Sequence, residues 1–195
     1  GMITLGDHGN KIDLMLFKAT DKPEQNNIQT DTLTDPPLEN LVLGCNVHKN
    51  FGQTISIKGE YALSILSSDI RVDEVFMDRY TYINNLGNLF TPRYSTSVAD
   101  MYGITAEFSF EKIMVGATYK HISPGYRSLG TSYLENDYED FTFNTTLNLW
   151  QGKVNFGGSI GKRRDNLSGR KDTESIRNIY NTNLTVAPNE KLNLN

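Results

Sequence analysis

The connections between the alternating segments of this chain are short and long in turn. Five tight ones lie near residues 7–10, 48–52, 110–112, 150–153 and 187–191. Four wide ones lie between them, at residues 21–38, 66–98, 123–138 and 164–174. Tight turns on one rim, long loops on the other and strands of about ten residues between them are the pattern of a barrel that winds up and down. The chain is therefore predicted to be all-β, an antiparallel up-and-down meander β-barrel of about 8 to 10 strands.

The segment 53–65 shows the strand pattern most clearly, because Ile55, Ile57 and Tyr61 share one parity while Ser56 and Lys58 share the other. Successive side chains of a strand point to opposite faces, so this strand has one apolar and one polar face. The same alternation predicts six further strands, at residues 41–48, 102–110, 113–120, 141–149, 154–161 and 176–186.

The first full strand, residues 11–18, is less regular, because Met15 and Phe17 interrupt its polar parity. The alternation around Ile3 and Leu194 predicts two short terminal strands. Either these two strands pair with each other and close the sheet, or the chain is a fragment of a larger barrel. A chain of 195 residues without an internal hinge is predicted to form a single domain, residues 1–195.

Composition excludes several classes of protein. The apolar runs are far shorter than the roughly 20 residues of a membrane-spanning helix. A net charge of -4 without a basic stripe argues against nucleic acid as a partner. The single cysteine, Cys45, excludes an internal disulfide framework. The histidines His8, His48 and His121 lack metal-ligand spacing, so neither a metal site nor another cofactor is expected.

Alternation alone does not show which face meets water, since a soluble β-barrel or sandwich needs the same pattern with its apolar side inward. Two features favour a membrane barrel. One is the strict order of the connections. The other is a set of aromatic residues on strands or at strand ends, where interfacial belts form: Tyr61, Tyr119, Phe141, Trp150 and Tyr180.

Residues 39–44, 59–64 and 125–130 are similar in style to Gram-negative outer-membrane β-barrel proteins, and the chain from Lys11 to Asn195 resembles that broad, uncharacterised family. The resemblance implies an outer-membrane location, lipid as a partner, extracellular long loops and periplasmic tight turns. It assigns no functional residue. The expected role is structural, binding or transport-related in the cell envelope and not catalytic. The alternatives are a soluble β-barrel or sandwich that binds a ligand or partner protein, and a hydrolase on the barrel rim.

Two loops carry features of their own. In 66–98, apolar residues from Val72 to Ile83 recur every three or four positions, which predicts a short amphipathic helix that either caps the barrel mouth or lies against the rim. In 123–138, an arginine lies among tyrosines, a combination common at binding surfaces, so this loop is the candidate site for a carbohydrate or protein ligand. The alternative is a loop packed on its own tyrosines. The candidate residues are Tyr126, Arg127, Tyr133 and Tyr138.

The polar parity brings charges of both signs to one face. If this face lines a lumen, opposite charges are expected to pair and fill it, giving a closed barrel and not a wide channel. The expected lumen residues are Lys58, Glu60, Glu107, Lys120, Arg163 and Arg177. Catalysis has one weak candidate pair, His121 and Ser123, which share a face but have no assigned carboxylate partner, so no catalytic residue is predicted.

Overall fold

The structure is a computed structural model that describes residues 1–7, 9–22, 36–131, 134–189 and 192–194. It contains a single sheet in which each strand pairs antiparallel with its neighbours in the chain, so the strand order is the sequence order. The strands are β1 (Met2–Gly6), β2 (Asn10–Thr20), β3 (Glu39–Phe51), β4 (Ile55–Ser67), β5 (Thr96–Ser109), β6 (Ile113–Ile122), β7 (Tyr138–Leu149), β8 (Val154–Asp165), β9 (Ile176–Asn189) and β10 (Leu192–Leu194).

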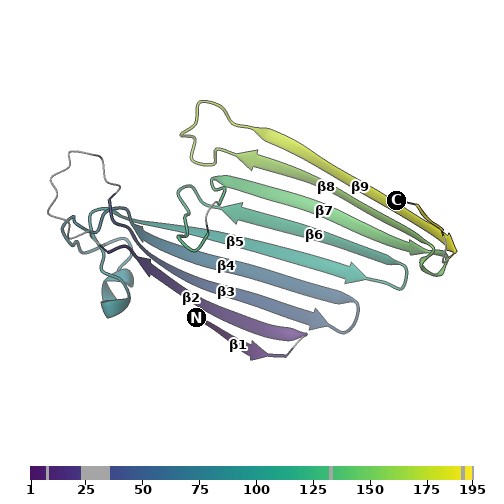
Figure 1. The fold of residues 1–195 in the computed structure, drawn as a ribbon, viewed down its shortest axis with the longest axis horizontal. Helices are drawn as coiled ribbons and strands as arrows, with labels where there is room; N and C mark the ends of the chain where they lie inside the picture. The colour runs from purple at the N-terminus through teal and green to yellow at the C-terminus, as the bar shows by residue number, and fades with distance from the viewer. Residues whose placement is uncertain (8, 23–35, 132–133, 190–191, 195) are drawn as a thin grey trace.

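The predicted antiparallel meander is confirmed, including all eight full strands and both short terminal ones. The long loops lie at one end of the sheet and the tight turns at the other (Figure 1). Several strands run further than the alternation indicated. β3, for example, continues to Phe51, which moves its turn to residues 52–54.

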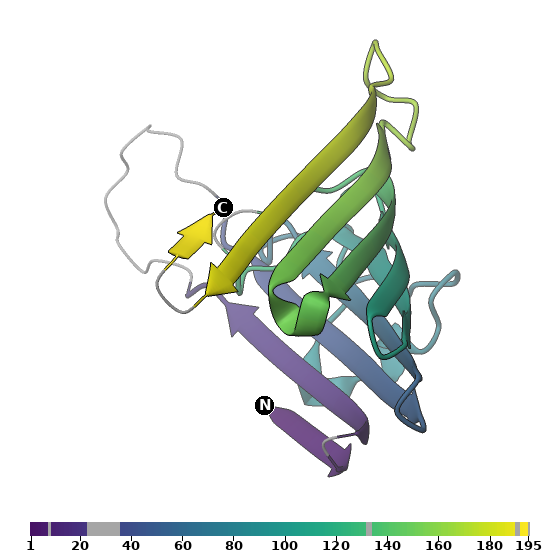
Figure 2. The same ribbon diagram turned by 90° about the vertical axis from the view of Figure 1, so that its right-hand side faces the viewer.

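The sheet is open. Among the described residues β1 pairs only with β2 and β10 only with β9, so the pairing of the two terminal strands with each other is not formed. The sheet is nevertheless twisted and curved: in Figure 2 β9 runs through the upper part of the view and β2 through the lower part, and the two strands slope in opposite directions.

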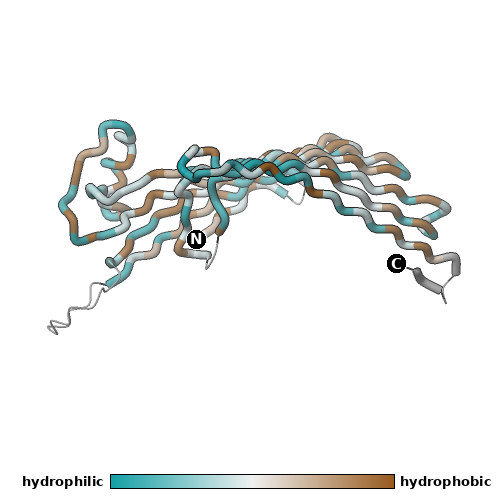
Figure 3. The backbone as a smooth tube through the Cα atoms, turned by 90° about the horizontal axis from the view of Figure 1, so that it is seen from above, coloured by the Kyte–Doolittle hydropathy of each residue, from teal (hydrophilic) through white to brown (hydrophobic). Residues whose placement is uncertain are grey.

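The strand register collects the apolar residues on one face. Direct cross-strand partners connect β4 to β9 in one continuous row: Ile57, Ala106, Ala117, Phe143, Ile160 and Tyr180. Figure 3 shows the underlying alternation of hydrophobic and hydrophilic residues along the strands. Much of this apolar face is uncovered, since Ile104 is 55% exposed and Ile160 50% exposed.

Glycine environments show which face is concave. On the polar face a Cβ added to Gly103 would lie 2.8 Å from Glu60 Oε1, and one added to Gly116 would lie 2.8 Å from Asn144 Oδ1. On the apolar face a Cβ at Gly59 would meet nothing within 4 Å. Side chains converge on the inside of a curved sheet and diverge on its outside. The polar face is therefore the inner face and the apolar face the outer one.

The difference between the crowded inner face and the open outer face predicts opposite effects when glycine is replaced by valine on β5 and on β4. Gly103→Val should cost about 1 to 3 kcal/mol, because the new side chain displaces the Glu60 carboxylate. Gly59→Val should be neutral or stabilising by up to about 1 kcal/mol, because it adds a β-branched residue in open space and restricts the unfolded chain. Denaturant midpoints at an unchanged slope measure both effects. Equal destabilisation by the two variants would contradict the assignment of the faces.

Residues 69–94 cover part of the outer face near the long-loop rim. Ile83 and Phe90 pack on Leu41 of β3 and Ile65 of β4, and all four side chains are buried. The segment contains two single 3-10 turns, η1 (Ile83–Asn85) and η2 (Gly87–Leu89). It lies against the rim and not over the polar face.

The short helix predicted in residues 66–98 occurs only as the 3-10 turns η1 and η2, and the amphipathic helix expected from Val72 to Ile83 is not formed. The two arms of the segment bond to each other instead: the Val75 amide donates to the Pro92 carbonyl and the Tyr94 amide to the Asp73 carbonyl. These bonds join the two arms, and Ile83 and Phe90 pack on the sheet between them. Within the described ranges, no helix has the length and apolar character needed to cross a membrane.

Candidate functional site

The inner face contains a hollow of about 360 Å³ that spans five strands, from β2 to β6. Most of the residues that line it have polar side chains, and the charged ones alternate in sign along the strands. The inner-face residues that line it are Lys11, Asp13, Asn46, His48, Lys58, Glu60, Gly103, Thr105 and Thr118. Asp13 is only 6% exposed, and it accepts a hydrogen bond from Thr4 Oγ1 at 2.7 Å and pairs with Lys11 Nζ at 2.9 Å.

The six residues expected on a lumen all lie on this inner face, and each has an oppositely charged partner. Lys58 Nζ lies 2.8 Å from Glu107 Oε2, and Lys120 Nζ lies 3.2 Å from Glu60 Oε1. Arg163 pairs with Asp140 at 2.7 Å and with Glu135 at 3.0 Å. Arg177 lies 4.0 Å from Asp165. These pairs neutralise much of the charge on the inner face.

The Glu60–Lys120 pair depends on a glycine between its partners. Glu60 on β4 faces Gly103 on β5, and Gly103 faces Lys120 on β6, so the pair crosses a whole strand. A side chain at Gly103 would occupy the space through which Glu60 passes. The sequence alternation placed Glu60 and Lys120 on the same face. Predicting that they pair would also have required the register of three neighbouring strands.

The loop between β6 and β7, residues 123–137, folds over the inner face. Ser64 Oγ of β4 donates a hydrogen bond to the Arg127 carbonyl, and the Leu129 amide donates to Asn40 Oδ1 of β3 at 3.0 Å. The Phe17 ring of β2 lies where a Cβ on Gly130 would contact it at 3.2 Å. Glu135, at the other end of the loop, pairs with Arg163 of β8. The loop therefore reaches from β2 to β8 across the long-loop end of the inner face.

The predicted ligand-binding residues of this loop have different surroundings. Tyr126 is 3% and Tyr138 8% exposed, and both pack with Ile122 in a small core on the inner face. Arg127 has an exposed side chain, and Tyr133 lies outside the described residues. The geometry thus matches a loop packed on its own tyrosines, and a hollow of about 270 Å³ beside this core is lined by Tyr126 and Arg127, two of the predicted residues.

Electrostatics support this packing role. Burial raises the pKa of the Tyr126 phenol, and the nearby Glu60 carboxylate adds to the increase, so Tyr126 stays neutral at physiological pH. The Arg163 guanidinium lies 4.4 Å from the centre of the Tyr138 ring, a cation–π geometry. The loop core is therefore joined to the ion-pair network of β7 and β8.

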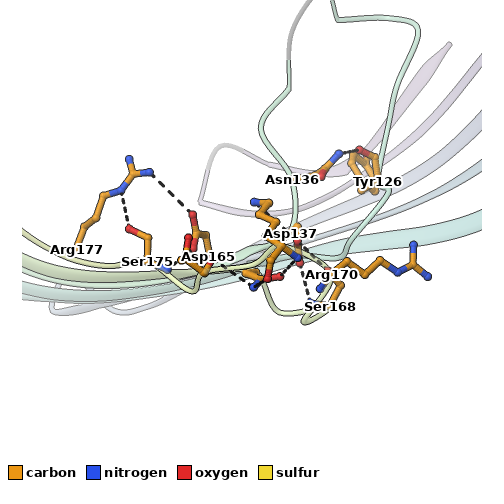
Figure 4. Close-up of polar contacts among 11 residues, drawn as sticks. Tyr126, Asn136, Asp137, Asp165, Ser168, Arg170, Ser175 and Arg177 are labelled. Atoms are coloured by element: carbon orange, nitrogen blue, oxygen red, sulfur yellow. Dashed lines mark hydrogen bonds and ion pairs between the residues drawn. The ribbon is translucent and has the colours of Figure 1, made fainter.

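Asp137, which the sequence analysis did not single out as a site residue, holds two long loops together (Figure 4). Its carboxylate accepts hydrogen bonds from the Ser168 amide at 2.9 Å and the Ser168 hydroxyl at 3.0 Å, and its carbonyl accepts one from the Asn166 amide. Its φ of 65° lies in the left-handed region, which Asp tolerates better than most residues. The Asn136-Asp137 pair is a turn signal that could have indicated this.

Ser123 and His121 meet on the outer face, with Ser123 Oγ 3.4 Å from His121 Nε2. The Ser123 hydroxyl donates to Asp100 Oδ1 at 2.5 Å, while the His121 ring stacks on Tyr102 at 4.8 Å. A serine nucleophile needs the carboxylate on the histidine, where it orients the base. Here the Ser123 hydroxyl donates its hydrogen bond to the carboxylate and not to the histidine, so His121, Ser123 and Asp100 do not form the relay of a serine hydrolase. No group of potential metal ligands occurs among the residues that the structure places.

The outer face has aromatic residues at both ends of its apolar band. Midway along β4 and β5, next to the part that residues 69–94 cover, Tyr61 pairs with Tyr102, whose ring lies 6.2 Å from that of Tyr119. At the tight-turn end Phe51, Phe110 and Trp150 are exposed.

No family model, curated protein or solved structure matches the chain. The resemblance to outer-membrane barrels consequently has no support from relatives, and the functional argument depends on the geometry.

Proposed function

We propose that this chain forms a membrane β-barrel, or part of one, whose outer face contacts lipid acyl chains and whose polar inner face is enclosed. The observation that carries the proposal is the uncovered apolar face on the outside of a curved sheet whose inside is polar and ion-paired. In water such a face would be an aggregation hazard, because monomeric soluble proteins rarely expose contiguous apolar patches of more than a few hundred Å².

The dimensions of the outer face agree with a bilayer. At roughly 3.3 Å per residue, the stretch from Tyr102 to Phe110 covers about 26 Å along the strand. A strand tilt of about 40° reduces its projected height to roughly 20 Å, close to the apolar band of about 25 Å in bacterial outer-membrane barrels. The bacterial outer membrane is thinner than average, which favours that location.

The role that fits this architecture best is structural or ligand-binding in the cell envelope, without catalysis. Loop 123–137 covers the long-loop end of the inner face, and paired charges line the remainder. A wide aqueous channel requires an unobstructed interior, so these features favour a closed barrel. The runner-up is a soluble β-barrel or sandwich in which another protein surface covers the apolar face.

Cysteine labelling distinguishes the two proposals. In a Cys45→Ala background, Ile104→Cys places a thiol on the outer face of β5, and Thr105→Cys places one on its inner face. With an environment-sensitive fluorophore and lipid vesicles, the label at 104 should show blue-shifted emission that lipid-borne quenchers reduce, whereas the label at 105 should not respond to those quenchers. Equal insensitivity of both labels to lipid quenchers, in a chain that stays folded and monomeric without lipid or detergent, would reject the membrane barrel.

A further inference from the structure

Residues 69–94 extend the row of tyrosines on the outer face. The Tyr80 and Tyr82 rings make an edge-to-face contact with centroids 6.1 Å apart. Tyr80 packs against the buried cluster of Leu41, Ile65, Ile83 and Phe90, so this pair of rings lies over the outer face of β3 and β4. Tyr82 is still 48% exposed. The row thus continues from β6, through β5 and β4, onto a segment outside the sheet.

We infer that residues 69–94 form an interfacial segment that lies in the polar headgroup layer of the membrane, with Tyr82 in contact with lipid. The inference rests on the proposed function and adds a partner for this segment. It goes beyond the expectation of a loop against the rim, because it assigns the exposed side of the segment to lipid headgroups and not to bulk water.

The position of the segment supports a bilayer interface. It covers the part of the apolar face that extends past the tyrosine row on β3 and β4, where Leu41 and Ile65 are fully buried beneath it. In the cross-strand row of Tyr61 and Tyr102 itself, the outer face becomes polar on β6 and β7, since Tyr102 lies opposite His121 and His121 opposite Glu139. Apolar side chains that would project beyond the hydrocarbon layer are therefore covered by the chain itself.

The chemistry of the row favours lipid over a protein partner. Tyrosine is enriched at membrane interfaces because its ring is apolar and its hydroxyl is polar. Lys162 of β8 lies on the outer face opposite Phe141. A lysine on the apolar face can lay its stem along the surface and reach an anionic headgroup with its ammonium.

Tryptophan fluorescence tests the inference. Trp150→Phe removes the single native tryptophan. Tyr82→Trp, Ile104→Trp and Arg127→Trp are each introduced into that background, in vesicles of phosphatidylcholine brominated near the headgroup or deep in the acyl chain. The tryptophan of Tyr82→Trp should lose more fluorescence to the shallow bromines, and that of Ile104→Trp more to the deep bromines. The tryptophan of Arg127→Trp, on the inner loop, should lose little to either.

The outcomes separate the inference from the proposed function. Quenching of Ile104→Trp without quenching of Tyr82→Trp would overturn the inference and leave the membrane barrel intact. Blue-shifted but unquenched emission from Tyr82→Trp would mean that protein, such as a second copy of the chain, covers the segment, which also overturns it. Absence of quenching in both variants would reject the membrane barrel itself. If Tyr82→Trp does not fold, a fluorophore on Tyr82→Cys in a Cys45→Ala background gives the same readout.

Discussion

Replacing Ile104 with arginine is expected to destabilise the lipid-inserted protein by about 1 to 3 kcal/mol, between the cost of a cation at the midplane on the lipid face of a barrel and the smaller cost near its interface. Ile104 lies on the outer face of β5, between the tyrosine row and the tight-turn aromatics, and it is 55% exposed. If that exposed surface met water, the same substitution would change stability by no more than about 0.5 kcal/mol. Reversible denaturant unfolding in vesicles measures the difference.

Phe76→Arg provides the matched control. Phe76 is also a large apolar residue and is 67% exposed, but it lies in the segment 69–94 outside the sheet. Its replacement should cost between 0 and about 1 kcal/mol, because charges are tolerated near the membrane interface. A cost at Ile104 no larger than at Phe76 would contradict a lipid-facing outer surface.

The strands and their faces could be predicted because they depend on local geometry. The alternation of Ile55, Ser56, Ile57 and Lys58 follows from the pleat alone and needs no knowledge of neighbouring strands. For the same reason the charged residues of the polar parity could be assigned to one face. The alternation also gave the order of connections, and with it the antiparallel meander.

Contacts between residues far apart in sequence could not be predicted in this way. Met15 and Phe17 were recognised only as exceptions to the polar parity. In the structure Met15 lies over Gly44, and Phe17 lies against Gly130 of the inward loop. Each of these two apolar side chains on the inner face therefore has a packing contact. The contact of Phe17 comes from a loop that is far away in the sequence.

The helix predicted from Val72 to Ile83 does not form for a related physical reason. An apolar residue every third or fourth position also suits an irregular segment that packs against a sheet, and periodicity does not distinguish the two. The outcome here depends on backbone bonds between Val75 and Pro92 and between Asp73 and Tyr94, which are distant in sequence. Without a strong helix N-cap or a long periodic run, these tertiary bonds prevail over helix propensity.

Tyr126→Ala is expected to release loop 123–137 from the inner face. Tyr126 is the most buried aromatic residue of that loop among those described, with 3% exposure, and it packs on Ile122 and Ala62. Truncation of a buried aromatic side chain typically costs about 3 to 5 kcal/mol, and the loss here should fall mainly on the attachment of the loop and less on the sheet. Tyr94→Ala is the control, because Tyr94 is 75% exposed and should contribute less than about 0.5 kcal/mol.

Trypsin provides the readout, because the bond after Arg127 becomes cleavable only when the loop opens. In the native loop the Arg127 carbonyl accepts a hydrogen bond from Ser64, and the Leu129 amide donates to Asn40, so the backbone around this bond is held against β3 and β4. If Tyr126 holds the loop closed, a cost of about 3 kcal/mol should speed cleavage by roughly 100-fold when opening is fast relative to cleavage. Tyr94→Ala should cleave at the parent rate. Equal rates for Tyr126→Ala and the parent would mean that the ion pairs and backbone bonds keep the loop in place without the tyrosine core, and Tyr126 would again become available as a ligand contact.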